Sequence, residues 1–311
     1  GDHRDLHSFP TRRSSDLVRE LRGEMSGLNR SMGSMATSVK GLVAAYAGFA
    51  SIQAASGFIK DSILTFANFD DVMRQVAATS GATKEQLKAL TELAKEMGAS
   101  TRFSATQAAE GLKTMSLAGL TAKQQMAALP KVLELAAAGS VDLETAAGIA
   151  TTSLAQFGLK ASDLVDVNNI LVTAFTNSAT NIQELGLAMQ YAGPVAKAAG
   201  SNFKETATVL AILAKNGFSG EKAGTALRAA YARLLNPVAK AKETIKQLGL
   251  NTQDASGKLL PMTQILRNLR STGAGAAEMI RIFGVEAAPA LTSAVGMSSK
   301  AFEELIAKFN N

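Results

Sequence analysis

The sequence lacks cysteine and tryptophan, and its two histidines, His3 and His7, both lie close to the start of the chain. The absence of cysteine excludes disulfides, thiolate nucleophiles and cysteine-ligated metals. Residues 18–311 also contain no histidine, so the commonest general base and the commonest metal ligand are both missing there. We therefore predict no catalytic, cofactor-binding or metal-binding residues and no enzymatic activity.

Aromatic residues are also scarce, at 5% of the chain, although 47% of its residues are hydrophobic. The apolar content is supplied mainly by alanine, leucine, valine and methionine, and alanine, leucine and methionine lose little on entering a helix. The sequence thus predicts an all-α fold, with a long coiled-coil-type helix followed by a domain of many short helices. The net charge of +6 permits anionic partners without identifying one.

The first 17 residues, GDHRDLHSFPTRRSSDL, do not resemble the rest of the chain. In order, they can be back-translated into a DNA string that looks like a common sequencing-library adapter. We interpret residues 1–17 as an artefactual, non-native segment and exclude it from the fold argument. Its three arginines and three aspartates cancel, so the positive charge belongs to the remaining chain. The first methionine is Met25, and we expect the chain to be a fragment at both ends.

Residues 18–68 are predicted to form an amphipathic, coiled-coil-like helix. Apolar residues recur there in alternating steps of three and four, which are the a and d positions of a heptad repeat. The seam comprises Val18, Leu21, Met25, Leu28, Met32, Met35, Val39, Leu42, Tyr46 and Phe49. We expect self-association through Val18–Phe49. A single amphipathic helix packed on its own core is the alternative.

The longest uncharged run is Gly41–Ile59, GLVAAYAGFASIQAASGFI. Its 19 residues are enough to cross a bilayer, but it contains two serines, a glutamine and three glycines besides its apolar residues. A buried or coiled helix is the favoured interpretation. Membrane contact through Gly41–Ile59 is the alternative.

Residues 69–311 are predicted to form a helical core domain of helices about 12–18 residues long. Glycines that follow apolar runs mark the expected helix ends, as residues in the left-handed conformation often do: Gly98, Gly119, Gly139, Gly158, Gly200, Gly217 and Gly249. Capping-box patterns mark the expected starts: Thr83–Gln86, Ser104–Gln107, Thr121–Gln124 and Thr180–Gln183. No residue-level repeat is evident, so a solenoid is not predicted.

One stretch of the core departs from the helical pattern. Residues 249–261, GLNTQDASGKLLP, predict a turn around Asp254–Gly257, with room for two very short strands.

Two kinds of catalytic pattern occur by spacing. Ser201–Lys204 and Ser219–Lys222 match the S-x-x-K spacing of serine acyl-enzymes, but the companion S-D-N and K-T-G motifs are absent. Paired carboxylates could hydrolyse glycosides, and the candidates are Glu110, Glu144 and Glu184. Each lies in a helical pattern without flanking sugar-binding residues, so a solvated face or a helix cap is the favoured interpretation.

Residues 220–246 raise two further possibilities. Gly220 and Gly224 are four apart, which favours close approach of two helices, and no phosphate-binding motif surrounds them. The six basic residues between Lys222 and Lys246 do not align, because Arg228 lies well round the helix from Lys222 and Arg233. We predict a solvated surface and no specific recognition of nucleic acid.

Several stretches, taken together and in order, resemble the core region of phage tail tape measure proteins. The resemblance covers about residues 69–285. It rests on FDDVMRQVAATSGAT (69–83), LAKEMGASTRFSATQAAEGLKTMSLAGL (93–120), LVTAFTNSATNIQELGLAMQYAGPVAKAAG (171–200), AILAKNGFSGEKAGTALRAAYARLLNP (211–237) and GLNTQDASGKLLPMTQIL (248–266).

The resemblance implies a structural tail-assembly protein of a phage or prophage. Such a protein sets tail length, templates polymerisation of the tail tube and leaves the tube during DNA delivery. Tail-tube, tail-tip and tail-assembly chaperone proteins are the implied partners, and the tail lumen and the host cytoplasm during assembly are the implied locations. The alternatives are a membrane-active or pore-forming protein acting at genome ejection, and a tail-associated peptidoglycan hydrolase.

Overall fold

The structure, a computed structural model, describes the backbone of residues 52–310, with side chains from Leu64 onward. Within that range it is all-α and contains no strand, which confirms the predicted fold class. The helices are α2 (Ile52–Ser80), α3 (Lys84–Ser100), α4 (Ala105–Leu117), α5 (Ala122–Gly139), α6 (Leu143–Phe157), the 3-10 helix η1 (Ala161–Asp163), α7 (Leu164–Thr176), α8 (Ile182–Ala198), α9 (Phe203–Lys215), α10 (Gly220–Leu235), α11 (Ala239–Gln247), α12 (Met262–Thr272), α13 (Ala276–Gly296) and α14 (Ser299–Asn310).

The chain divides into two units, and the boundary lies between Ala67 and Asn68, inside α2. Of the first unit, the structure describes residues 52–67, where the side chains of Leu64 and Phe66 are exposed. The predicted coiled-coil seam Val18–Phe49 lies outside the described residues, as does the larger part of Gly41–Ile59. Among the described helices, none is long and apolar enough to cross a membrane.

Local signals in the sequence locate the starts of three helices of the second unit, α3, α4 and α5. The capping boxes at Thr83–Gln86, Ser104–Gln107 and Thr121–Gln124 are all formed, with side chain and backbone bonded reciprocally. The predicted Thr180–Gln183 box is wrong by one residue. Asn181 is the N-cap of α8, and its side chain accepts a hydrogen bond from the backbone N–H of Glu184 at 2.8 Å.

Glycines mark most helix ends, as predicted, but not all of them. Gly158 caps α6 with a φ of 64°, a backbone conformation that glycine adopts without a steric penalty. Gly98 is an error of prediction, because it lies inside α3. A Cβ there would lie 2.4 Å from the backbone nitrogen of Ala105, so Gly98 allows the start of α4 to lie against α3.

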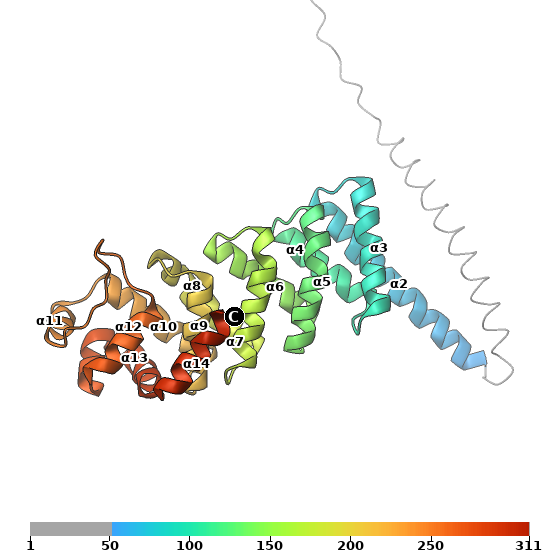
Figure 1. Cartoon of the computed structure of the whole chain (residues 1–311). Helices are drawn as coiled ribbons and strands as arrows, with labels where there is room; N and C mark the ends of the chain where they lie inside the picture. Colours follow the sequence, from blue (N-terminus) through green and yellow to red (C-terminus); the bar gives the residue numbers. More distant parts are fainter. Residues whose placement is uncertain (1–51, 311) are drawn as a thin grey trace, which may run out of the picture. The chain divides into compact units, whose positions relative to one another are not determined.

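Helices α3 to α10 form two rows. Each helix packs against its neighbour in sequence and also against the next helix but one, so that α4, α6, α8 and α10 form one row and α3, α5, α7 and α9 form the other (Figure 1). This is the arrangement of an α-solenoid, which the sequence did not predict. The helices range from 13 to 18 residues, and the repeat in space therefore has no fixed period in sequence.

Small residues allow the row of even-numbered helices to pack closely. A Cβ on Gly111 of α4 would lie 2.9 Å from Leu143 of α6, and one on Gly186 of α8 would lie 2.9 Å from Ile149 of α6. A Cβ on Gly224 of α10 would lie 2.5 Å from the carbonyl oxygen of Ala188 in α8. The close helix approach predicted from the glycine spacing is thus confirmed at Gly224.

The two rows enclose a continuous hydrophobic core. It is built from leucine and alanine side chains with few rings, and the rings that are present link distant helices. Phe157 at the end of α6 and Phe203 at the start of α9 meet edge-on, with centroids 5.4 Å apart. Burial of this apolar surface against both neighbours is the main force that holds the stack together.

The chain after α10 has a different plan. Residues 249–261 form the predicted turn, with one isolated antiparallel bridge between Gln253 and Leu259 in place of two strands. Helix α13 packs on α10 and is interrupted at Gly284, whose φ of 78° and ψ of 170° are not helical. Helices α12 and α14 both pack on α9.

Candidate functional site

The two S-x-x-K patterns do not form a catalytic pair. The hydroxyl of Ser201 lies 3.1 Å from that of Thr206 and donates to the carbonyl of Asn202 at 3.5 Å. Ser219 is the N-cap residue of α10, although its side chain makes no capping hydrogen bond. Both serines therefore lie at helix starts, which is the structural role expected of this residue type.

The three candidate glutamates lie on three different helices. Glu110 is in α4, whereas Glu144 and Glu184 are in the first turns of α6 and α8. A negative charge in the first turn interacts favourably with the helix dipole. The carboxylate of Glu184 accepts a hydrogen bond from Thr180 at 3.2 Å. No bond joins any two of these glutamates, and residues 52–310 contain no cluster of three potential metal ligands.

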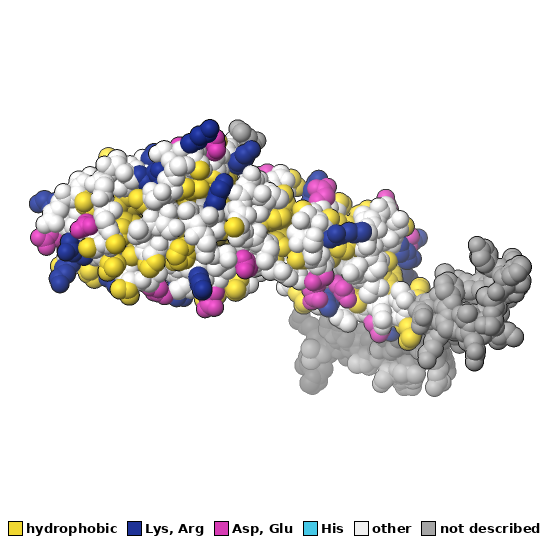
Figure 2. Space-filling model, turned by 90° about the horizontal axis from the view of Figure 1, so that it is seen from below, with side chains coloured by type: hydrophobic (Ala, Val, Ile, Leu, Met, Phe, Trp, Pro, Cys, Tyr) yellow, Lys and Arg dark blue, Asp and Glu magenta, His cyan; other side chains and the backbone are white. Residues whose placement is uncertain are grey.

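The basic residues after Lys222 are dispersed, as predicted. The guanidinium of Arg228 lies 5.8 Å from the ring centroid of Tyr191 in α8, while Arg233 lies over the backbone of Gly284 in α13. On the face drawn in Figure 2, lysine and arginine side chains are scattered and do not line up in a stripe.

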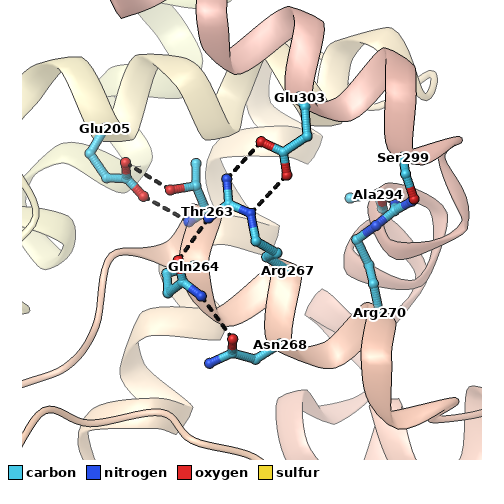
Figure 3. A network of polar contacts seen from close by, with 9 residues as sticks. All are labelled: Glu205, Thr263, Gln264, Arg267, Asn268, Arg270, Ala294, Ser299 and Glu303. Carbon is cyan, nitrogen blue, oxygen red and sulfur yellow. Dashed lines mark hydrogen bonds and ion pairs between the residues drawn. The ribbon is translucent and has the colours of Figure 1, made fainter.

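A polar network joins α9 of the stack to the C-terminal helices α12, α13 and α14 (Figure 3). Glu205, in the first turn of α9, accepts hydrogen bonds from the backbone N–H of Thr263 at 2.7 Å and from its hydroxyl at 3.2 Å. Arg267 of α12 forms a two-point ion pair with Glu303 of α14, at 2.7 and 2.8 Å. Bidentate pairs of this kind fix geometry as well as charge.

Arg270 extends this network to the end of α13. Its guanidinium donates to the carbonyls of Ala294 and Val295 and to the hydroxyl of Ser299, and it lies 5.1 Å from the ring centroid of Phe302. It therefore supplies donors to the last turn of α13, where helical donors run out, although the Ala294 carbonyl also accepts from the backbone N–H of Met297 at 3.3 Å. Sequence reasoning missed this network, because its partners are separated by up to 58 residues.

The charges in the network shift the ionisation of its members. The hydrogen bond from Arg267 lowers the pKa of Glu303, and Arg270 adds to this effect. The same bond raises the pKa of Arg267. Both side chains remain about half exposed, at 40% and 50%, so the pair adds little to the free energy of unfolding. Its main effect is to fix the orientation of α14 relative to α12.

A small cavity of about 120 Å³ lies beside the network, lined by residues 199–202, Glu205, Tyr231 and Leu259–Pro261. The Tyr231 side chain is 1% exposed, and its hydroxyl makes no hydrogen bond of standard geometry, although the Ser201 hydroxyl lies near enough to interact with it. Burial raises the pKa of Tyr231, and the Ser201 hydroxyl opposes the shift only in part.

A larger groove lies between α5 and the start of α7. This α5–α7 groove has a volume of about 420 Å³ and is lined by Lys123, Gln124, Ala127, Ala128, Lys160, Ala161, Ser162, Leu164 and Val165. Its surface is mainly apolar. Ala127 and Ala128 of α5 line one side of it, and residues of η1 and the start of α7 line the other.

The fold and the candidate sites together indicate a class of protein. The described residues form an α-helical stack held by contacts between small apolar residues. A polar clamp, the network of Glu205, Arg267, Arg270 and Glu303, joins its last helices. The groups that sequence patterns offered for catalysis lie apart or serve as helix caps. Such an arrangement is typical of a structural or binding scaffold.

Comparison with known proteins gives the family. Residues 91–296 match the family described as phage-related minor tail protein. The chain is 33% identical over 219 residues to a tape measure protein of Pneumococcus phage Dp-1, and 30% identical over 226 residues to a probable tape measure protein of Escherichia phage P2. The chain therefore belongs to the family of phage-related minor tail proteins. No solved structure matches it.

The match is to a part of each relative. It covers 70% of this chain in both cases, but only 19% of the Dp-1 protein and 28% of the P2 protein. The resemblance to tape measure proteins noted from the sequence is thereby confirmed.

Proposed function

We propose that this chain is the core segment of a non-enzymatic tape measure protein that helps to set the length of a phage tail and to template its tube. The observation that carries the proposal is the alignment of more than 200 residues with two proteins named as tape measure proteins. In this role the chain is a component of the virion tail and meets tail-tube, tail-tip and chaperone proteins during assembly in the host cytoplasm.

The two-row stack is suited to only part of that role. An extended helix converts residue count into length at about 1.5 Å per residue, so a helical bundle can act as a ruler. In the stack, successive helices lie side by side. Residues added there lengthen one helix or add another helix to the stack, and they do not extend the whole protein by about 1.5 Å each. We therefore assign residues 69–311 to an end piece that engages a tail tip or an assembly partner, and the ruler to helical sequence outside it.

The segment before the stack has a separate proposed role. The heptads of Val18–Phe49 support self-association of the parent chain, which would place several copies side by side in one tail.

Tail length in electron micrographs tests the proposal. In-frame deletions in the helical stretches of the parent gene outside this core should shorten tails by roughly 1.5 Å per residue removed. A deletion of α4 and α5 within the stack should instead abolish or reduce assembly, with the surviving tails near normal length. Unchanged tail lengths after deletions outside the core would contradict the ruler function.

A further inference from the structure

We propose that the α5–α7 groove is a docking site for an acidic amphipathic helix of another protein. The floor of the groove contains the buried side chains of Ala128 and Leu164, and its wall contains Val165, which is 42% exposed. An exposed valine beside a mainly apolar hollow leaves surface that a partner's apolar side chains can cover. The inference depends only on the groove and not on the proposed role in tail length.

The charges around the groove select the partner's sign. Lys123 and Lys160 are the charged residues that line it, and both are exposed. Asp163 follows closely in sequence, but its carboxylate accepts hydrogen bonds from the N–H of Lys160 at 2.8 Å and from the Ser162 hydroxyl at 3.2 Å. Asp163 is not among the residues that line the groove, and its carboxylate is already hydrogen-bonded by Lys160 and Ser162. The lining itself therefore carries two positive charges.

The same charges disfavour a second copy of this chain as the occupant. The lining of the groove is positive, and the predicted self-association segment Val18–Phe49 also carries a net positive charge, so that segment does not complement the two lysines. A helix fits better than an extended peptide, because the described residues 52–310 contain no β-strand that could pair with one. Apolar residues at helical spacing, flanked by glutamates, would fill the hollow and meet both lysines.

Peptide binding to the full chain tests the site. The probe is a fluorescein-labelled helical peptide with leucine at i, i+3, i+4 and i+7 and glutamate at the flanking positions. Fluorescence anisotropy at low ionic strength should show saturable binding. A peptide with lysine in place of glutamate, and one with alanine in place of leucine, should each bind at least about tenfold more weakly.

Charge reversal on the protein supplies the matched comparison. The double variant Lys123→Glu/Lys160→Glu should weaken binding of the acidic peptide at least about tenfold. The equally charged control Lys88→Glu/Lys242→Glu, at exposed positions of α3 and α11, should change it less than about threefold. Lys123 lies in the first turn of α5, where a glutamate suits the helix dipole, so the groove variant is expected to fold.

A reporter inside the groove covers the case in which a variant fails to fold. Because the chain has no cysteine, Val165→Cys provides a single labelling position for an environment-sensitive fluorophore. The acidic peptide should change its emission, whereas a label at Leu235→Cys on α10 should not respond. The proposal is overturned by equal binding of the lysine peptide, by no saturation up to about 1 mM, or by a groove label that does not respond.

Discussion

The α3–α10 stack and the C-terminal helices α11–α14 use different interactions for the same purpose. In the stack, helices meet through glycine and alanine, and contacts are between neighbours in the sequence order. The C-terminal helices are joined by polar side chains: Glu205 of α9 binds the start of α12, Arg267 of α12 pairs with Glu303 of α14, and Arg270 of α12 binds the end of α13. The comparison teaches that close steric fit suffices where neighbouring helices repeat, whereas polar cross-links fix the helices that end the repeat.

The largest expected effect is steric and breaks the stack. Gly224→Ala would place a methyl group 2.5 Å from the carbonyl oxygen of Ala188, and that backbone cannot move without separating α10 from α8. We expect a loss of about 3 kcal/mol in the free energy of unfolding, measured by urea denaturation. The control is Gly148→Ala in α6, where no atom lies within 4 Å, and a gain of up to about 1 kcal/mol is expected. Equal effects at both positions would refute the steric account.

The next largest expected effect is a loss of stability when the polar clamp is weakened. Arg270→Ala removes donors to the end of α13 and the contact with Phe302, and should cost about 2 kcal/mol. Amide hydrogen exchange should rise selectively in α14, residues 299–310. Arg281→Ala is the control, because that exposed arginine has only a local pair with Glu278 at 3.4 Å and should cost less than about 0.5 kcal/mol. Faster exchange spread over the whole stack would contradict a local clamp.

A smaller effect should increase stability at the boundary between the two regions. Tyr231 of α10 buries a hydroxyl that makes no hydrogen bond of standard geometry, so Tyr231→Phe removes an unsatisfied polar group at little cost in packing. We expect the free energy of unfolding to rise by about 1 kcal/mol. A fall of similar size would show that the hydroxyl is hydrogen-bonded in the folded protein, either to Ser201 or to water in the adjacent cavity.

The smallest expected effect is on the pH dependence of the free energy of unfolding. The folded-state pKa of Glu303 is lowered from its ordinary value of 4.5 by Arg267. Its stabilisation is therefore present above pH 4.5 and is lost as the pH falls through the lowered folded-state pKa. Solvent screening limits it to less than about 1 kcal/mol. Denaturation curves between pH 6 and pH 3 should show a smaller loss for Glu303→Gln than for the unchanged protein, and identical pH dependence would contradict the pairing.

The same comparison explains what the sequence could predict. Capping boxes such as Thr83–Gln86 are complete within four residues, so the pattern alone locates them. The α8 start was missed by one residue because Thr180 and Asn181 are both good N-cap residues, and the fold selects Asn181. The two-row stack was not predicted, because it depends on which helix faces meet and not on a repeated string of letters.

The candidate site shows the same limit. The close approach at Gly224 was predicted from spacing, since small residues four apart occupy one face of a helix. The Arg267–Glu303 pair spans 36 residues and belongs to no short motif. The α5–α7 groove is lined by two separate stretches, residues 123–128 and 160–165, so no single residue pattern indicated it.

The row arrangement also has a mechanical consequence. Because each helix of the stack contacts mainly the helices one and two places away in the chain, a pulling force on one end loads the helices at that end before the others. The domain should therefore unravel in small steps, each resisted by one apolar interface, and not in a single high-force rupture. At the C-terminal end the Arg267–Glu303 and Arg270 contacts must separate first. A protein built in this way can hold its form at rest and still be drawn, helix by helix, through a passage narrower than its folded width.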